Sequence, residues 1–232
     1  LTLIPIMLDH FSEAVGVQLM CKQQKENSMI FSEENFLEPK LYKDLQDKTE
    51  YLYKLSKVEK HTMAIKREAL DSSRGIYSTT ESVQYCKRFR FWCNGDDVMK
   101  ETIDFFGPQI EEVLLQVKNY LIKKGWKDIK LSNIWFQYGD TETQMHRHSD
   151  GTIHDATDDN CFTSMIFAHP EEWDSDWGGE FKVESMDGTE TTIHNPDPNS
   201  FIVWNRHHPH WMTPIVKECP LRMFIGMSWY EK

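Results

Sequence analysis

The sequence contains no hydrophobic run long enough to cross a membrane, because its most apolar stretch near the start, residues 1–8, is short and interrupted by Pro5. This stretch also lacks a basic flank and a small-residue cleavage site, so we expect no signal peptide. No collagen repeat or low-complexity tract is visible. The 39% hydrophobic and 27% charged residues are typical of a globular chain. We therefore expect a soluble, cytoplasmic protein without a membrane partner.

Cysteine is sparse, and its spacing carries no motif. The five cysteines are Cys21, Cys86, Cys93, Cys161 and Cys219. No two of them have the C-x-x-C spacing of a zinc knuckle, and an odd, scattered set does not suggest a disulfide framework. This pattern favours a reduced, intracellular setting.

Positive charge is scarce in the second half of the chain. Residues 1–130 hold 20 Lys and Arg against 20 Asp and Glu, whereas residues 131–232 hold 6 against 17. Residues 150–180 contain nine acids and no Lys or Arg, which disfavours nucleic-acid binding through this half. Eight of the ten histidines lie between His146 and His210. Imidazoles among carboxylates are typical of a metal site.

The first half of the chain reads as mainly helical. Hydrophobic periodicity predicts helices over residues 9–25, 39–60 and 96–125, the last of them kinked or divided at Pro108. Arginines alternate with aromatic residues over residues 88–92, which predicts a short, half-buried edge strand. Stacking of this segment on a nucleic acid is the less favoured interpretation.

After residue 130 the sequence changes to short, aromatic and β-branched runs separated by turn residues, which is typical of a sandwich or barrel. Strands are predicted over residues 132–138, 161–168, 180–186, 189–194, 200–204, 210–216 and 221–229, with a hairpin turn at Asp187-Gly188. We expect an α+β protein with a jelly-roll core and helices packed outside it, mostly from the N-terminal half. Residues 1–130 would pack on a core formed by residues 131–232, within one structural domain.

His148 and Asp150 are two residues apart, so on an extended chain both side chains project from one face. The histidine-rich segment 206–210 is the candidate source of a third ligand. Two histidines and one carboxylate form the facial triad of non-haem Fe(II) oxygenases. H-x-D alone is weak evidence, because it also occurs in solvated turns. His146 has no acid two residues later and is predicted to be a surface residue or a neighbour of the ligands.

Several further motifs follow in a fixed order: Tyr138-Gly139, then His148-Ser149-Asp150, then Asp176-Trp177-Gly178-Gly179-Glu180-Phe181, then residues 201–210 with Thr213-Pro214, then Arg222 and Trp229-Tyr230. In this order the chain resembles the 2-oxoglutarate/Fe(II)-dependent oxygenases, specifically the prolyl 4-hydroxylase branch, over about residues 133–230. The resemblance implies a double-stranded β-helix core. It also implies iron ligation by His148, Asp150 and His210, with His207 and His208 as weaker candidates.

Arg222 falls where the family binds the far carboxylate of 2-oxoglutarate. A cation inside the apolar run 221–225 needs an anionic partner, although a structural salt bridge is the alternative. Lys217 is a fallback carboxylate binder. Tyr138 matches a family tyrosine that donates to the cosubstrate, although alone it would be a core aromatic.

Three tryptophans, Trp204, Trp211 and Trp229, are interpreted first as packing residues and second as substrate walls. The interval from Arg222 to Trp229 is one residue longer than the family pattern, so we expect a β-bulge on the last strand.

The resemblance implies an enzyme that uses Fe(II), 2-oxoglutarate and dioxygen, with L-ascorbate as an associated small molecule, to hydroxylate an unactivated C–H bond. The expected substrate is a prolyl residue in a peptide or protein. A free amino acid or other small metabolite is the alternative, and a non-catalytic, cupin-like metal-binding module is a third hypothesis.

We expect loops 151–160 and 170–177 to line the entrance, where acids such as Glu171, Glu172 and Asp174 would favour a cationic or neutral substrate. Solvated loops without a role are an equal alternative.

Overall fold

The computed structural model describes residues 30–58, 74–78, 84–85, 87–92, 96–139, 143–151, 160–169 and 171–231. The helices are α2 (Pro39–Val58), α4 (Asp96–Phe106), α5 (Gln109–Lys123) and the short 3₁₀ helix η2 (Ser175–Trp177). The strands are β1 (Ile30–Glu33), β2 (Arg74–Ser78), β3 (Gln84–Tyr85), β4 (Lys87–Trp92), β5 (Ile129–Gly139), β6 (Gln144–His148), β7 (Cys161–Phe167), β8 (Phe181–Glu184), β9 (Thr191–His194), β10 (Phe201–Asn205), β11 (His210–Met212) and β12 (Arg222–Glu231). Within these ranges no helix is both long and apolar enough to span a membrane.

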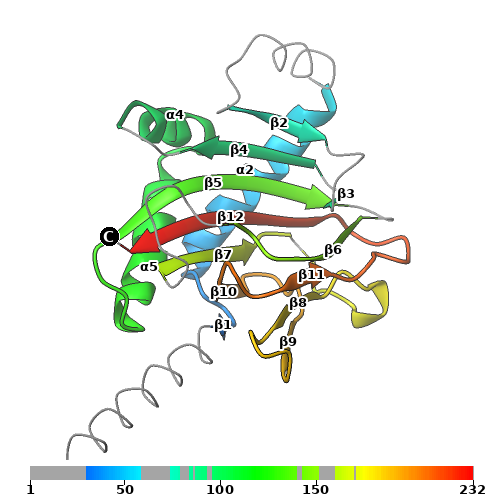
Figure 1. Ribbon diagram of the computed structural model, residues 1–232. Helices are drawn as coiled ribbons and strands as arrows, with labels where there is room; N and C mark the ends of the chain where they lie inside the picture. Colours follow the sequence, from blue (N-terminus) through cyan, green and yellow to red (C-terminus); the bar gives the residue numbers. More distant parts are fainter. Residues whose placement is uncertain are drawn as a thin grey trace, which may run out of the picture.

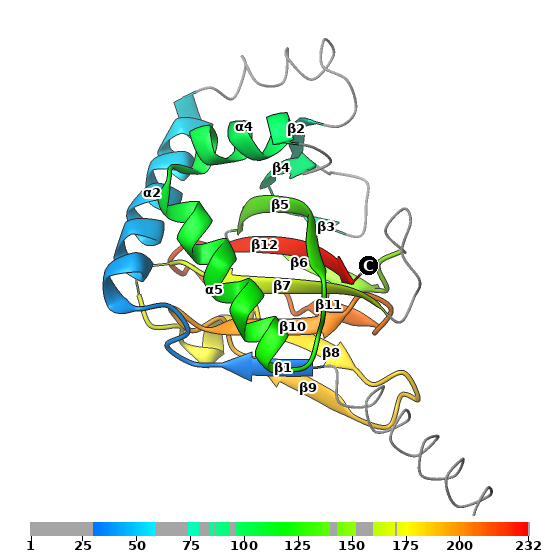
Figure 2. The same ribbon diagram turned by 90° about the vertical axis from the view of Figure 1, so that its left-hand side faces the viewer.

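The strands form two antiparallel sheets that face each other (Figure 1). The larger sheet has the order β1-β10-β7-β12-β5-β4-β2, and the smaller one has the order β3-β6-β11-β8-β9. Helices α2 and α5 lie across the outer face of the larger sheet (Figure 2). The predicted α+β fold, a jelly-roll core with helices outside it, is confirmed.

Apolar side chains fill both faces of the larger sheet. On the helix side, residues of α2 and α5 such as Leu45 and Val117 pack with Phe136, Ile166 and Ile225 from the sheet. Between the two sheets, a smaller cluster is made by Trp135, Met165, Phe167, Phe181, Val183, Ile202, Trp204 and Phe224. The alternation of side chains along each strand sends neighbouring residues into different layers.

The predicted helix over residues 39–60 is α2, and the helical pattern over 96–125 divides into α4 and α5 as expected. Pro108 stands at the N-cap of α5 with φ −63°, where a proline costs nothing because no helical N–H is needed there. The predicted helix over residues 9–25 lies outside the described residues. The seven predicted core strands correspond to β5, β7, β8, β9, β10, β11 and β12, of which β11 is shorter than expected.

Residues 88–92 do form a strand, but it is not an edge strand. β4 pairs with β5 on one side and with β2 on the other, so the prediction of an edge position is wrong. Alternation alone could not reveal β2, because strand partners are chosen by tertiary contacts.

The strands β1 and β6 were not predicted. β1 pairs with β10, and thus extends the larger sheet with residues from the first half of the chain. β6 is half-exposed and polar, so it lacks the apolar alternation that marks a buried strand. The division of the chain at residue 130 stays a prediction.

Candidate active site

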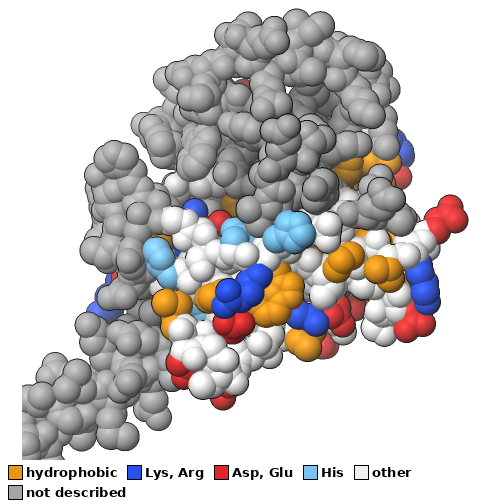
Figure 3. Space-filling view, turned by 45° about the vertical axis from the view of Figure 1, so that its right-hand side comes forward, with side chains coloured by type: hydrophobic (Ala, Val, Ile, Leu, Met, Phe, Trp, Pro, Cys, Tyr) orange, Lys and Arg blue, Asp and Glu red, His pale blue; other side chains and the backbone are white. Residues whose placement is uncertain are grey.

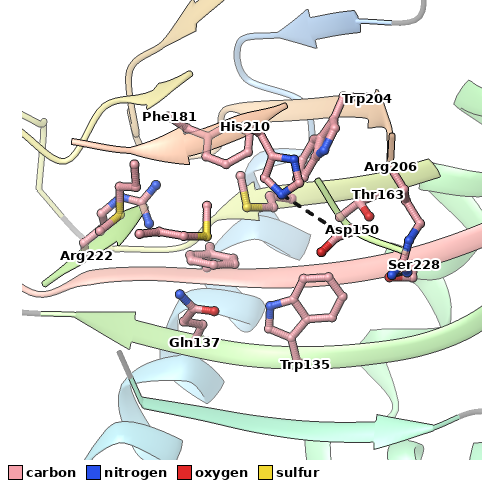
Figure 4. A pocket seen from close by; sticks show the side chains of 14 residues that line it. Trp135, Gln137, Asp150, Thr163, Phe181, Trp204, Arg206, His210, Arg222 and Ser228 are labelled. Carbon is pink, nitrogen blue, oxygen red and sulfur yellow. Dashed lines mark hydrogen bonds and ion pairs between the residues drawn. The ribbon is translucent and has the colours of Figure 1, made fainter. Parts of the chain in front are cut away.

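A pocket opens between the two sheets and contains about 570 Å³ of space, including its open mouth. The side chains that line it come from both sheets and the adjoining loops (Figure 4). They are Trp135, Gln137, Met145, Asp150, Thr163, Met165, Phe181, Trp204, Arg206, His210, Met212, Arg222, Phe224 and Ser228.

The three predicted metal ligands meet at this pocket. His148 ends β6 and His210 begins β11, and the two are direct partners in the antiparallel register. Asp150 lies beside both, with one carboxylate oxygen 3.8 Å from His148 Nε2 and the other 3.8 Å from His210 Nε2. One ligand atom from each residue lies within 4.8 Å of the other two. This arrangement could hold a single metal ion.

Hydrogen bonds orient both imidazoles toward that point. His148 Nδ1 donates to the carbonyl of His146, and His210 Nδ1 donates to the carbonyl of His208, each over 2.8 Å. Because a carbonyl can only accept, Nδ1 carries the proton and Nε2 keeps its lone pair for a metal. His146 is exposed, as predicted, and contributes through its backbone.

Burial keeps the distal imidazole neutral. The pKa of His210 is lowered to about 4, mainly because the ring is removed from water, and the charge of Asp150 opposes this shift. Burial also lowers the pKa of His208, whose Nδ1 donates to the carbonyl of Glu184. The His208 side chain is thus anchored to β8, while its backbone carbonyl accepts from His210 Nδ1 and orients that ring. His208 itself lies outside the triad.

A register shift in β6 explains how His148 and Met145 both reach the pocket region. His148 pairs with His210 and Met145 pairs with Met212, so two residues of β6, His146 and Arg147, oppose the single residue Trp211 of β11. Such a bulge lets side chains three apart share one face. On the outer surface, Arg147 pairs with Glu184. In space-filling view, separate histidine side chains lie on one face of the molecule among acidic, basic and hydrophobic ones (Figure 3).

Arg222 lies at the other end of the pocket and is 3% exposed. Its Nε donates to the carbonyl of Gly179 over 3.0 Å. The guanidinium carbon lies 4.7 Å from the ring centre of Phe167 and 5.2 Å from that of Phe224. Two aromatic rings and a backbone carbonyl hold the guanidinium in place. A carboxylate in the pocket would have a planar, charged partner.

Two more imidazoles lie behind Arg222. The pKa values of His169 and His194 are each lowered to about 4, first by burial and second by the charge of Arg222. His194 stacks on Phe167, which separates it from the guanidinium, and His194 Nε2 lies 3.1 Å from Ser200 Oγ. Both rings are therefore neutral at physiological pH, which leaves Arg222 as the cation of this region.

The double glycine of the motif Trp177-Gly178-Gly179 has a packing reason. Gly178 has φ +75°, and a Cβ there would lie 2.1 Å from the carbonyl oxygen of Pro214. Gly179 has φ +76° and offers its carbonyl to Arg222. The motif thus lets the chain turn closely past residues 214–215 and deliver an acceptor to the guanidinium.

Tyr138 does not lie in the pocket. Along β5, Trp135 and Gln137 face the pocket, while Phe136 and Tyr138 face the helices. The Tyr138 ring packs edge-to-face on Tyr53 of α2, with centroids 4.9 Å apart. Adjacent side chains of a strand face opposite sides of the sheet, so Tyr138 points away from the pocket that Gln137 lines. The structure therefore does not support the cosubstrate role that the motif suggested.

Only one of the three predicted tryptophans lines the pocket. Trp204 does so, with its ring centre 5.2 Å from that of His210. Trp211 follows His210 on β11 and points to the other face, where it is half-buried. Trp229 packs on the helix side, and its Nε1 donates to Ser164 Oγ over 3.0 Å. Trp229 is therefore a packing residue, the first interpretation of the sequence, and neither Trp211 nor Trp229 lines this pocket.

The register shift expected near Trp229 is present, but the extra residue belongs to β5. Ser228 pairs with Asn133 and Trp229 with Leu131, so Ser132 is the unpaired residue. The side chains of β12 therefore alternate without interruption, and Trp229 faces the same side of the sheet as Met227.

The remaining predicted site residues lie at the surface. Lys217 forms an exposed ion pair with Asp176, 3.2 Å long, and does not line the pocket. Glu171, Glu172 and Asp174 are exposed and are likewise absent from the lining. Residues 152–159 lie outside the described residues, so the predicted role of the loops stays a prediction.

Sequence reasoning missed Arg206 and Gln137 as pocket residues. Arg206 lies in the histidine-rich segment 206–210, whose histidines were the candidate ligands. Its side chain faces the same side of the extended chain as that of Trp204, two residues earlier. Gln137 directly opposes Phe224 on β12. The two-residue spacing from Trp204 was the feature of the sequence that could have indicated Arg206 as a pocket residue.

Residues 134–231 match the family model described as the 2OG-Fe(II) oxygenase superfamily. No curated protein matches the chain in sequence. Over these residues the resemblance to the 2-oxoglutarate/Fe(II)-dependent oxygenases is confirmed at the level of the superfamily, and with it the dioxygenase class and the cofactors, Fe(II) with 2-oxoglutarate and dioxygen as cosubstrates.

Solved structures of prolyl hydroxylases share the fold. A Pseudomonas putida prolyl-4-hydroxylase is 14% identical with a TM-score of 0.52, and the alignment covers 88% of this chain and 92% of that one. A Trichoplax adhaerens prolyl hydroxylase, solved in complex with a hypoxia inducible factor oxygen degradation domain peptide fragment, is 16% identical with a TM-score of 0.56, covering 96% and 92%. At these identities the likeness concerns the fold.

Proposed function

Because residues 134–231 form a 2-oxoglutarate/Fe(II) oxygenase domain, we propose that His148, Asp150 and His210 hold its Fe(II) and that Arg222 binds the far carboxylate of 2-oxoglutarate. The observation that carries this proposal is the position of a metal-ligand triad and a buried guanidinium along one pocket. The reaction we propose is hydroxylation of an unactivated C–H bond.

The donor set fits the metal. Two imidazole nitrogens and one carboxylate on one side of an ion leave positions open for a keto acid and dioxygen, which is the pattern of non-haem Fe(II) oxygenases. The carbonyl-bound Nδ1 atoms of both histidines already select the tautomer that a metal needs. When bound, the iron would supply the redox chemistry that couples decarboxylation of 2-oxoglutarate to substrate oxidation.

The chain's own residues bind, orient and exclude water. Arg222 would fix one end of the cosubstrate, since its guanidinium is held by Gly179 and by two aromatic faces. Trp135, Trp204 and Phe181 form apolar walls around the triad. Such walls keep water from the reacting groups.

For the substrate, we propose a prolyl residue of a peptide or protein. The support is the fold shared with the Pseudomonas putida and Trichoplax adhaerens enzymes, the second of which was solved with a peptide. A small carboxylic acid such as a free amino acid is the second candidate, because the guanidinium of Arg206 also lines the pocket.

The test is succinate formation from 2-oxoglutarate with Fe(II), measured across a panel of prolyl peptides and free amino acids, together with equilibrium Mn(II) binding. We expect His148→Ala to abolish turnover and to weaken Mn(II) binding at least 100-fold, an estimate typical for loss of a metal ligand. The control is His146→Ala, which removes an exposed ring two residues away and keeps the backbone carbonyl. Retained turnover in His148→Ala would refute the ligand assignment.

A further inference from the structure

At the end of the pocket away from Arg222, the inner face of the larger sheet becomes polar. Asn133 on β5, Ser228 on β12 and Thr163 on β7 form one row, because Ser228 pairs directly with each of the other two. Their exposed fractions are 1%, 2% and 1%. Direct partners in antiparallel strands point to the same face, so the three side chains lie side by side.

Two oxygen atoms of this row lack a partner. Within the described parts of the chain, Thr163 Oγ1 and Asn133 Oδ1 are buried and make no hydrogen bond. Buried polar atoms are nearly always satisfied, so an unsatisfied hydroxyl at the wall of a cavity indicates a group that binds there. The Thr163 hydroxyl can donate to an acceptor in the pocket, whereas Asn133 Oδ1 can only accept. Thr163 and Ser228 both line the pocket.

Arg206 adds a positive charge to the same corner. Its Nη1 donates to Ser228 Oγ over 2.8 Å, and its Nε donates to the carbonyl of Gly151 over 3.1 Å. Among the described residues, these two hydrogen bonds are the contacts of its guanidinium. A guanidinium has five N–H donors, so three remain after these two bonds. Arg206 can therefore bind a further acceptor while it holds Ser228 and Gly151.

This corner is separate from the cosubstrate end. Arg222 and Ser228 are six residues apart on β12, which corresponds to about 20 Å along a strand. The triad residues Asp150 and His210 lie between the two arginines (Figure 4). Arg206 and Arg222 therefore serve opposite ends of the pocket.

We propose that Arg206, with the hydroxyl groups of Thr163 and Ser228, forms a subsite for a carboxylate of the substrate. The substrate is then a molecule that carries a carboxylate near the hydroxylated carbon. This inference rests on the proposed function and deepens it. The carboxylate comes either from a free amino acid or from an acidic residue beside the target residue of a peptide.

A purely structural role makes a different prediction. The carbonyl of Arg206 accepts from the N–H of Asp150, and its side chain holds Gly151, so Arg206 also helps to position the Asp150 segment. If that were its whole role, substitution would weaken metal binding and would slow all substrates equally. A substrate subsite instead changes the preference between charged and uncharged substrates.

The experiment compares matched acids and amides. The panel holds the free amino acids with their carboxamides, and acetylated, amidated prolyl peptides with Asp or Asn beside the proline. Binding to the iron-free protein is measured by calorimetry, and succinate formation by the Fe(II) enzyme is measured in parallel. We expect the best carboxylate to bind at least tenfold more tightly than its uncharged partner. A preference among the free compounds identifies the amino-acid source, and a preference for Asp peptides identifies the side-chain source.

Variants locate the preference. Arg206→Gln is expected to raise the KM of the preferred acid at least tenfold with a change in kcat below threefold, and to leave the KM of the amide unchanged. Thr163→Val, which keeps both hydrogen bonds of Arg206, is expected to reduce the preference about threefold. The matched control is Arg147→Gln, an exposed arginine paired with Glu184, which is expected to keep the preference.

Equal binding of acids and amides overturns the subsite, as does a preference that survives Arg206→Gln or binding by uncharged compounds alone. The proposed function has its own criteria, Mn(II) binding and basal succinate formation, so its failure is read separately from the calorimetric result.

Discussion

The two faces of the larger sheet are built from the same strands, yet they have different tasks. On β12, Met223, Ile225, Met227 and Trp229 enter the helix-side core, while Arg222, Phe224 and Ser228 face the pocket. The helix side is packed almost wholly by apolar side chains, whereas the pocket side carries Arg222 and faces the triad, whose histidines belong to the smaller sheet. Successive side chains of one strand thus face the helix-side core and the pocket in turn, so the residues that stabilise the fold and those that bind ligands alternate along the strand. Changes on the helix side should cost stability, and changes on the pocket side should cost binding.

The largest expected effect is on the helix side. Phe136 is fully buried between β5 and the helices, so Phe136→Ala should lower the free energy of unfolding by about 3–5 kcal/mol. Urea denaturation measures this loss. The 2-oxoglutarate KM of the remaining folded protein should stay within about twofold of wild type, because the ring does not face the pocket. A large rise in KM at unchanged stability would reverse the assignment of the two faces.

Arg222→Met tests the pocket side. It removes the charge but keeps much of the apolar stem, so we expect a rise of about 100-fold in the KM for 2-oxoglutarate, equivalent to about 3 kcal/mol. Initial rates of succinate formation measure it, and Arg222→Lys should recover part of the affinity. An unchanged KM in Arg222→Met would move the cosubstrate to another cation.

Acid should act through the pocket side, where His169 and His194 are buried. Their pKa values of about 4 lie below the unfolded value of 6.5, so between these pH values the unfolded chain binds more protons than the folded one. Their contribution is complete above pH 6.5 and is lost as the pH falls toward 4. At pH 5 the expected loss is about 2 kcal/mol for each imidazole.

Urea midpoints at pH 7.5 and pH 5 measure this loss. His194→Gln, which has no titratable ring, should show a smaller difference between the two midpoints. An identical difference in the variant would mean that other groups carry the acid sensitivity.

The smallest effect is expected for Tyr138→Phe. Its ring packs on Tyr53 and faces away from the pocket, so the KM for 2-oxoglutarate should change by less than about twofold. A tenfold rise in the KM would restore the tyrosine to the cosubstrate site and would contradict the facing of β5.

Local chemistry was readable wherever spacing and residue type were sufficient. His148-x-Asp150, the distant His210 and a lone cation in an apolar strand indicated the site, because metal ligands and buried charges have few alternative explanations. The division of the helices at Pro108 followed from proline's missing N–H. These inferences need only the properties of neighbouring residues.

What the linear sequence could not decide was which way each strand side chain faces and which strands meet. The pocket lacks Tyr138 and Trp229 because these side chains lie on the helix side of β5 and β12, and it contains Arg206 at the end of β10. A shift of one residue moves a side chain through the sheet, and that choice depends on partner strands far away in the chain. The amino-acid order determined the chemistry available to this protein, and the tertiary packing decided which of those groups share one cavity.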